Sequence, residues 1–128
     1  MINPNGQALA YLGDAVLELL VRDHLIKKGI YQSKKLHEQG VYYTSALGQA
    51  TSLEAILEEL TEEEMRFYKR GRNASLTRKA RNQSLNTYQQ ATGLEALFGQ
   101  LYLNKENQRI TFLFNKIIAF MDPNNNLG

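Results

Sequence analysis

The sequence predicts an all-α fold of about six or seven helices. Apolar residues recur at spacings of three and four along most of the chain, and no segment shows the strict alternation of a half-buried strand. Only two prolines interrupt the chain, and signals that start or end helices separate the apolar stripes. A length of 128 residues suits one hydrophobic core, so we expect a single domain over residues 1–128.

The first predicted helix begins after Pro4 and Asn5 and runs to about Lys28, where Gly29 supplies a stop. Its apolar residues form one stripe that we expect to face the core, namely Leu9, Leu12, Val16, Leu19 and Leu20.

Gly13 and Asp14 interrupt this stripe. A glycine inside a helix costs up to about 1 kcal/mol relative to alanine, and an aspartate competes with the helix backbone for hydrogen bonds. Something must offset both costs. We expect a second helix to pass close to Gly13, with Asp14 projecting into the crevice between the two helices.

Two more helical segments are predicted in the middle of the chain. Ser33 is expected to cap a segment over residues 33–60, which is either one long helix or two abutting helices with a kink near Gly48. Thr61 and Glu64 have the spacing of a capping box, and this predicts a helix of about ten residues that ends at Gly71. Residues 71–84 have little apolar periodicity, so we expect a loop there.

The C-terminal part carries two strong helical stripes. The first lies on a helix expected from about Asn86 to near Asn104. The second lies on a helix expected to end at Asp122, because the residue before a proline, here Pro123, disfavours helical backbone. Residues 123–128 are expected to be a frayed tail.

The composition limits which metal ligands the chain can offer and where in the cell we expect it. The chain has no cysteine, so a metal would need oxygen or imidazole ligands, and a hard cation is the default. No apolar run is long enough to span a membrane and the N-terminus lacks a secretion signal, so we expect a cytoplasmic protein. The formal net charge of +2 does not by itself identify a nucleic-acid binder.

Glu95 is a second carboxylate within an apolar helix, and Gly93 and Gly99 lie near it. Taken alone, such a residue is more often an ordinary surface carboxylate. Two glycine-bearing helices could nevertheless cross closely enough to bring Asp14 and Glu95 to one cation, and these oxygen ligands suit Mg²⁺. Glu18, one turn after Asp14, either supports the site through water or forms the polar edge of its helix.

A basic segment lies between Asp14 and Glu95 in the sequence, with no acidic residue from Met65 to Leu85. It suits contact with phosphates, although a solvated charge run accounts for it equally well. The acids gather instead between residues 54 and 64, and this asymmetry favours a directed RNA or DNA surface. The candidate RNA contacts are Arg70, Arg72, Asn73, Arg78, Lys79 and Arg81.

The motifs around the two carboxylates resemble those of the ribonuclease III catalytic domain. Leu12-Gly13-Asp14-Ala15-Val16-Leu17-Glu18 resembles its signature, and Glu95-Ala96-Leu97-Phe98-Gly99 resembles its second conserved segment. We expect no double-stranded-RNA-binding domain after these motifs. With this feature and the segments Ala8-Leu9-Ala10-Tyr11 and Arg70-Gly71-Arg72-Asn73-Ala74, it is similar to the mini branch of the family.

The resemblance implies a homodimer that cleaves double-stranded RNA with Mg²⁺ and matures the ends of 23S ribosomal RNA precursor in bacteria. By position, Asp14 and Glu95 match the catalytic, metal-binding carboxylates of the family. The chain departs from classical members at Gln7, Ala10 and Thr92, where those carry acids, and the resemblance implies that the mini branch shares this loss. Without an auxiliary binding domain, the RNA is expected to be presented in protein-bound form, for example by a ribosomal protein.

Two alternatives stay open on the sequence. A non-catalytic helical dimer that binds double-stranded RNA as a ribosome-assembly scaffold is favoured by the missing acids and disfavoured by the retained Asp14 and Glu95. A protein-interaction domain, whose basic segment meets an acidic partner, would require that duplex RNA fail to bind at low salt.

Overall fold

A computed structural model describes residues 4–75 and 83–122 of the chain. These residues form six α-helices and one short 3-10 helix, with no strand among them. The elements are α1 (Gly6–Lys27), α2 (Ser33–Thr44), α3 (Ala46–Ile56), η1 (Leu57–Glu59), α4 (Glu62–Ala74), α5 (Gln83–Leu103) and α6 (Asn107–Met121). The predicted all-α class and the predicted number of helices are confirmed for this part of the chain.

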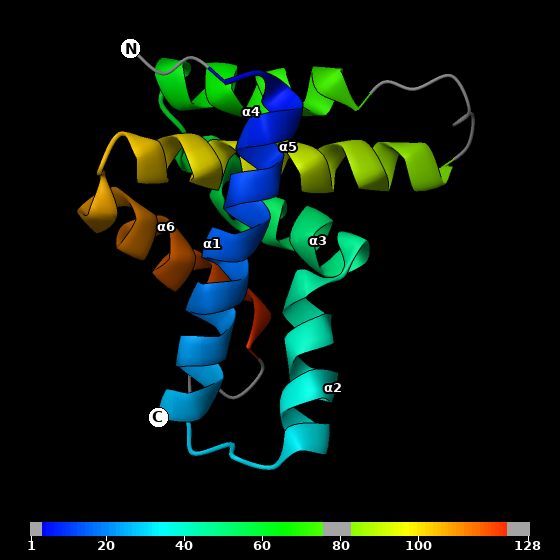
Figure 1. The fold of residues 1–128 in the computed structure, drawn as a ribbon, viewed down its shortest axis with the longest axis vertical. Helices are drawn as coiled ribbons and strands as arrows, with labels where there is room; N and C mark the ends of the chain where they lie inside the picture. Colours follow the sequence, from blue (N-terminus) through cyan, green and yellow to red (C-terminus); the bar gives the residue numbers. More distant parts are fainter. Residues whose placement is uncertain (1–3, 76–82, 123–128) are drawn as a thin grey trace.

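Helix α5 is the element on which the others pack. Figure 1 shows α1 crossing α5, while α4 runs alongside it, and α3 and α6 also contact it. The sequence of α5 explains this position, because a helix that is apolar around most of its circumference must be covered on several sides. Its fully buried residues are Leu94, Ala96, Leu97, Phe98 and Leu101.

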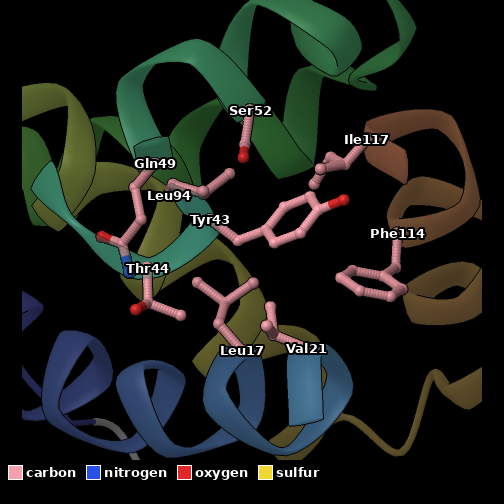
Figure 2. A pocket seen from close by; sticks show the side chains of 9 residues that line it. All are labelled: Leu17, Val21, Tyr43, Thr44, Gln49, Ser52, Leu94, Phe114 and Ile117. Atoms are coloured by element: carbon pink, nitrogen blue, oxygen red, sulfur yellow. The ribbon is translucent and has the colours of Figure 1, made fainter. Parts of the chain in front are cut away.

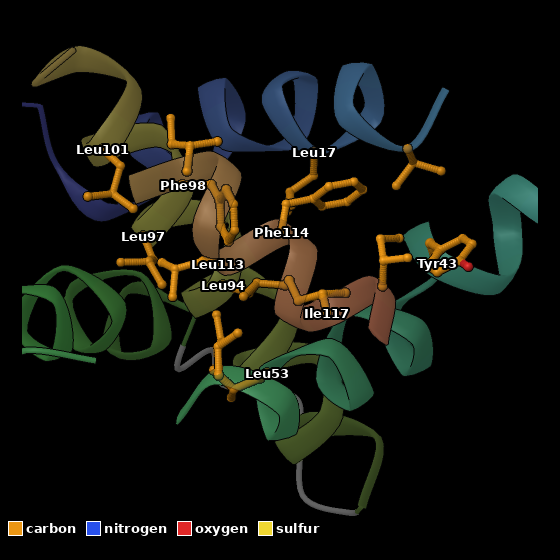
Figure 3. Packing of buried hydrophobic residues seen from close by; sticks show 14 of the residues in the cluster. Leu17, Tyr43, Leu53, Leu94, Leu97, Phe98, Leu101, Leu113, Phe114 and Ile117 are labelled. Atoms are coloured by element: carbon orange, nitrogen blue, oxygen red, sulfur yellow. The ribbon is translucent and has the colours of Figure 1, made fainter. Parts of the chain in front are cut away.

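The core lies where α1, α3, α5 and α6 meet. Figure 3 shows side chains from these helices interdigitating, among them Leu17 of α1, Leu53 of α3, Phe98 of α5 and Leu113 of α6. Burying one such side chain stabilises the fold by roughly 1.5–3 kcal/mol. The burial of several such side chains together therefore stabilises the packing of α1 against α5.

The buried face of α1 differs from the predicted stripe. Leu9 is fully buried, but Leu19 is 69% exposed, and the other three predicted positions are only partly buried. The buried positions are Gly6, Leu9, Ala10, Gly13, Leu17, Val21 and Leu25. The prediction was right for Leu9 and wrong for Leu19, and Val16 and Leu20 lie at the edge of the buried face, where they pack against the core. The helix is therefore rotated from the predicted orientation, with Leu17, Val21 and Leu25 on its buried face.

The ends of α1 follow the predicted signals. Asn5 caps the helix, since its Oδ1 accepts a hydrogen bond of 2.8 Å from the Ala8 amide. Gly29 has a φ of 90°, a left-handed conformation that glycine adopts without strain, and it follows directly on the end of the helix.

The segment over residues 33–60 forms α2, α3 and the short η1, and the break between α2 and α3 lies at Ser45 rather than at Gly48. The Ser45 Oγ accepts a hydrogen bond of 3.0 Å from the Gly48 amide, so Ser45 caps α3. The predicted cap at Ser33 is wrong, because α2 begins at Ser33 itself and Gln32 before it makes no side-chain cap. Gly48 instead lets α3 lie against the backbone of Tyr42 and Tyr43.

The predicted capping box of Thr61 and Glu64 is present at the start of α4. The helix does not end at Gly71 but continues to Ala74, because Gly71 faces α5 and allows close packing there. The predicted loop over residues 71–84 is therefore wrong at both ends, since α4 reaches Ala74 and α5 already begins at Gln83. Residues 76–82 and the predicted tail, 123–128, lie outside the described residues.

A buried ion pair joins α4 to α6. The Glu64 side chain, 6% exposed, contacts Arg109, with 2.7 Å from Nε to Oε2 and 2.8 Å from Nη2 to Oε1. Arg109 also donates a hydrogen bond of 2.7 Å to the Glu59 carbonyl. Burial acts to raise the pKa of Glu64, but the hydrogen bonds from Arg109 and Thr61 outweigh it and lower the pKa.

None of the helices in the described ranges combines the length and the apolar character needed to cross a membrane.

Candidate active site

Glycines let α1 and α5 cross with their backbones in contact. A Cβ atom added to Gly13 would overlap the Glu95 carbonyl and lie 2.9 Å from the Gly99 nitrogen. A Cβ atom added to Gly99 would overlap the Leu9 carbonyl. Any larger residue at either position would push the helices apart. The prediction that a second helix passes close to Gly13 is confirmed.

This crossing brings Asp14 and Glu95 together. Asp14 follows Gly13 on the exposed side of α1, and Glu95 lies partly buried on α5. Burial of Glu95, together with the neighbouring charge of Asp14, raises the pKa of the Glu95 carboxyl to about 7. Because the charge of Asp14 disfavours ionisation of Glu95, a cation between the two groups would favour the ionised Glu95 carboxylate.

Gln49 of α3 is a third polar side chain at this place. It is 3% exposed and lines a small cavity (Figure 2), and its proximity to Glu95 acts to lower the pKa of that carboxyl. The sequence analysis did not name Gln49, because it lies far from both motifs and belongs to no recognisable pattern. The one available signal was its position between two small residues, Gly48 and Ala50. Small residues permit close helix packing, so a long polar side chain between them could have been expected near another helix.

The donor set fits Mg²⁺ but is sparse. Mg²⁺ is commonly held by one or two carboxylates together with waters and substrate phosphates, and Asp14 and Glu95 supply two. Within residues 4–75 and 83–122, no group of three or more His, Cys, Asp or Glu side chains is placed to hold a metal. A cation here would therefore depend on water and on substrate oxygens for its remaining ligands.

The positions where the resemblance expects further acids do not add carboxylates. Gln7 is exposed and Ala10 is buried. Thr92 is buried as well, and its Oγ1 donates a hydrogen bond of 2.9 Å to the Tyr88 carbonyl within α5. Glu18 pairs with Arg22 at 3.1 Å on the surface of α1, as a residue on the polar edge of a helix would.

Half of the candidate RNA contacts lie within the described residues. Arg70 and Asn73 are exposed on α4, and Arg72 donates hydrogen bonds of 3.2 Å from Nε and Nη2 to the Asn73 Oδ1. The close contact of Gly71 with Thr92 and Ala96 brings this part of α4 beside the turn of α5 that carries Glu95. Arg78, Lys79 and Arg81 lie outside the described residues.

The histidines do not form a ligand pair. His24 packs edge-on against the rings of Tyr43 and Phe114, with centroids 6.1 Å and 6.3 Å away. Burial lowers the pKa of His24, although the hydrogen bond to Asp122 acts in the opposite direction. His37 is exposed on α2.

Comparison with known proteins agrees with this fold and this pair of motifs. A family model described as the ribonuclease III domain matches residues 7–106, which include both Asp14 and Glu95. The chain therefore belongs to the ribonuclease III family, and it is an endoribonuclease of that family.

Similar proteins place the chain more narrowly within the family. Mini-ribonuclease 3 of Enterococcus faecalis is 43% identical over 123 residues, which cover 94% of this chain and 93% of that protein. Mini-ribonuclease 3 of Staphylococcus aureus is 42% identical over 124 residues, covering 95% of this chain and 91% of that protein. A crystal structure of a protein from Fusobacterium nucleatum matches with a TM-score of 0.80 at 31% identity, covering 91% of this chain and 93% of that one.

The first prediction concerns the crossing itself. Gly13→Ala should lower the free energy of unfolding by at least about 2 kcal/mol, because the added methyl group meets the α5 backbone rather than a flexible side chain. Gly40→Ala is the control. A Cβ atom there meets nothing within 4 Å, so this change within α2 should be neutral or stabilising by up to about 1 kcal/mol. Urea denaturation measures both, and equal effects would contradict the close crossing.

The second prediction concerns pH. The raised pKa of Glu95 implies that its ionisation destabilises the metal-free fold as the pH rises from the ordinary carboxyl range through about 7. Glu95→Gln should therefore be more stable than the unmodified chain at pH 8 by on the order of 2 kcal/mol, and this gain should vanish near pH 4. Denaturation in chelator across this range tests it. A difference that does not change with pH would show that Glu95 titrates normally.

Proposed function

We propose that this chain is a Mg²⁺-dependent endoribonuclease that cleaves double-stranded RNA and matures the ends of 23S ribosomal RNA precursor. The observation that supports it most is the meeting of Asp14 and Glu95 at the glycine crossing of α1 and α5. The ribonuclease III family generally depends on divalent metal and acts on double-stranded RNA. In this proposal residues 1–128 act as a single catalytic domain in the cytoplasm.

Asp14 and Glu95 are the proposed catalytic and metal-binding residues. When bound, Mg²⁺ supplies an activated water and offsets the charge that develops on the phosphoryl oxygens. Asp14 offers an exposed carboxylate to the RNA side, whereas Glu95 offers one from the partly buried side. No lysine or histidine is needed as a general base.

The basic end of α4 is the proposed RNA contact. Arg70, Arg72 and Asn73 lie beside the turn of α5 that carries Glu95, and Arg78, Lys79 and Arg81 follow in the sequence. A-form RNA presents phosphates and 2′-hydroxyl groups rather than readable base edges, so this segment should bind backbone and depend on salt. Presentation of the precursor by a ribosomal protein would add the selectivity that these contacts lack.

We also propose that the chain works as a homodimer. Tyr11, Ala15 and Leu19 recur every four residues along α1, and all three are exposed, with Tyr11 at 85% and Leu19 at 69%. This apolar stripe begins beside Asp14, and a second copy would cover it. A dimer would present two sites, one for each strand of the duplex.

A non-catalytic scaffold that binds double-stranded RNA is the second candidate. One observation favours it, namely that Gln7, Ala10 and Thr92 add no carboxylate to the two that are present.

The third prediction tests the dimer. The unmodified chain should sediment as a dimer at micromolar concentration, and Leu19→Glu should sediment as a monomer, because a charge in the centre of an apolar interface is strongly destabilising. Tyr31→Glu is the control, since Tyr31 is 73% exposed in the connection after α1, away from the stripe. A monomeric unmodified chain would refute the proposed dimer.

The fourth prediction tests catalysis. Long duplex RNA at low salt should be cut with Mg²⁺ and left intact with chelator, and Asp14→Asn and Glu95→Gln should each slow cutting by about a hundredfold or more. Glu18→Gln, which removes only a surface ion pair, should cut at the normal rate. If duplex RNA and a ribosomal precursor both bind but stay intact, the scaffold function replaces the nuclease.

A further inference from the structure

Two neighbouring side chains hold the guanidinium group of Arg72, near the end of α4. Its Nε and Nη2 atoms each donate a hydrogen bond of 3.2 Å to the Asn73 Oδ1, and its Cζ atom lies 5.8 Å from the centre of the Tyr68 ring. A guanidinium over an aromatic ring, within about 6 Å of its centre, is attracted to the ring face. Contacts with two different residues therefore restrict where the charge of Arg72 can lie.

The backbone that carries Arg72 is fixed as well. The Ser75 Oγ and the Ser75 amide donate hydrogen bonds of 2.7 Å and 3.3 Å to the Arg72 carbonyl and close the last turn of α4. Gly71 packs on α5, and the start of α1 packs on the same turn of α4, because a Cβ atom added to Gly6 would overlap the Arg70 carbonyl. The end of α4 is thus held between α1 and α5, the two helices that carry the carboxylates.

Tyr68 connects Arg72 to the helix of Glu95. Tyr68 is 5% exposed, and its ring lies so close to Gly93 that an added Cβ atom there would overlap it. Gly93 precedes Glu95 by two residues in α5, which runs alongside α4 (Figure 1). Because the Tyr68 ring is confined by α5, it gives the guanidinium of Arg72 a fixed place relative to the turn that carries Glu95.

The exposed basic side chains of α4 are not held in this way. Arg66, Lys69 and Arg70 are exposed, and within the described part of the chain they form no ion pair or side-chain hydrogen bond. A side chain that binds from such a free position loses rotamer freedom on binding, whereas Arg72 is already restricted. Neither hydrogen bond to Asn73 uses Nη1 of Arg72, so its N–H groups can still donate to a phosphate oxygen.

We propose that Arg72 is a preorganised contact for one backbone phosphate of the duplex RNA, and that Asn73 is a positioning residue, which holds the Arg72 guanidinium over the Tyr68 ring. The inference rests on the proposed function and divides the basic end of α4 into one fixed contact and several loose ones. Phosphate contacts set the register of a protein on a duplex. A fixed contact beside the turn of Glu95 would therefore set which part of the RNA backbone meets the two carboxylates.

The test measures binding of a short, fluorescently labelled RNA duplex by anisotropy, at low salt and with chelator to prevent cutting. Arg72→Lys keeps the positive charge but loses the planar group that lies over Tyr68 and bonds to Asn73, so binding should weaken by about tenfold or more. Arg70→Lys is the matched control. Its affinity should stay within about twofold of the unmodified value, because a loose phosphate contact depends mainly on charge.

The salt dependence of binding shows whether Arg72 contacts a phosphate. Arg72→Gln should lower the slope of the logarithm of affinity against the logarithm of salt concentration by about one, the effect of losing one phosphate contact. A residue with a merely structural role would not change this slope.

Asn73→Ala tests the positioning role at an exposed residue. It should weaken binding by about threefold to tenfold, the cost of immobilising one long side chain on binding, and leave the salt slope unchanged because no charge is lost. If Asn73 acts through Arg72, the double variant Arg72→Lys/Asn73→Ala should bind within about twofold of Arg72→Lys alone. Circular dichroism checks that each variant is folded.

Equal losses of affinity in Arg72→Lys and Arg70→Lys would overturn the inference. Unchanged affinity in Asn73→Ala, or additive losses in the double variant, would overturn the positioning role of Asn73. These outcomes leave the proposed function intact if the unmodified chain binds the duplex and cuts it with Mg²⁺. If the unmodified chain does not bind duplex RNA at low salt, the proposed function itself is wrong and the inference falls with it.

Discussion

The structure depends on the contact between the backbones of α1 and α5. Gly13 and Gly99 remove the two Cβ atoms that would keep these helices apart, and each glycine faces backbone atoms of the other helix. Helices that pack through larger side chains stand about 8–10 Å apart, whereas at this crossing the two backbones are in direct contact. These glycines lower the helix propensity of α1 and α5, but they allow a close backbone contact that any larger residue would prevent.

The site builds on this contact from three sides. Helix α1 offers Asp14 at the surface, α5 offers Glu95 in partial burial, and α3 brings Gln49 from the interior. A fourth helix, α4, approaches α5 through Gly71, and its basic end lies beside the turn of α5 that carries Glu95. The three helices α1, α3 and α4 are each held in place by their own packing against α5.

Much of this arrangement could be predicted from the sequence, for definite physical reasons. The glycine next to Asp14 was anomalous in a helix interior, and the anomaly indicated the crossing that the structure contains. The capping box at Thr61 was readable because its pattern is local. In contrast, the buried face of α1 was only partly predicted, because apolar residues occur on more than one side of this helix and Leu17, Val21 and Leu25 lie beside the predicted stripe. Gln49 escaped as well, since its contact joins residues 46 positions apart, and no local rule describes such a pair.

The order of the helices along the chain has a consequence for biosynthesis. Gly13 meets its partners only at positions 95 and 99, and Lys28 meets Asp122 at 2.7 Å. Contacts so distant in sequence cannot form while the chain is short, and they slow folding because large loops must close first. The nascent chain therefore emerges from the ribosome with its two carboxylates apart, and they come together only once most of the chain has been made.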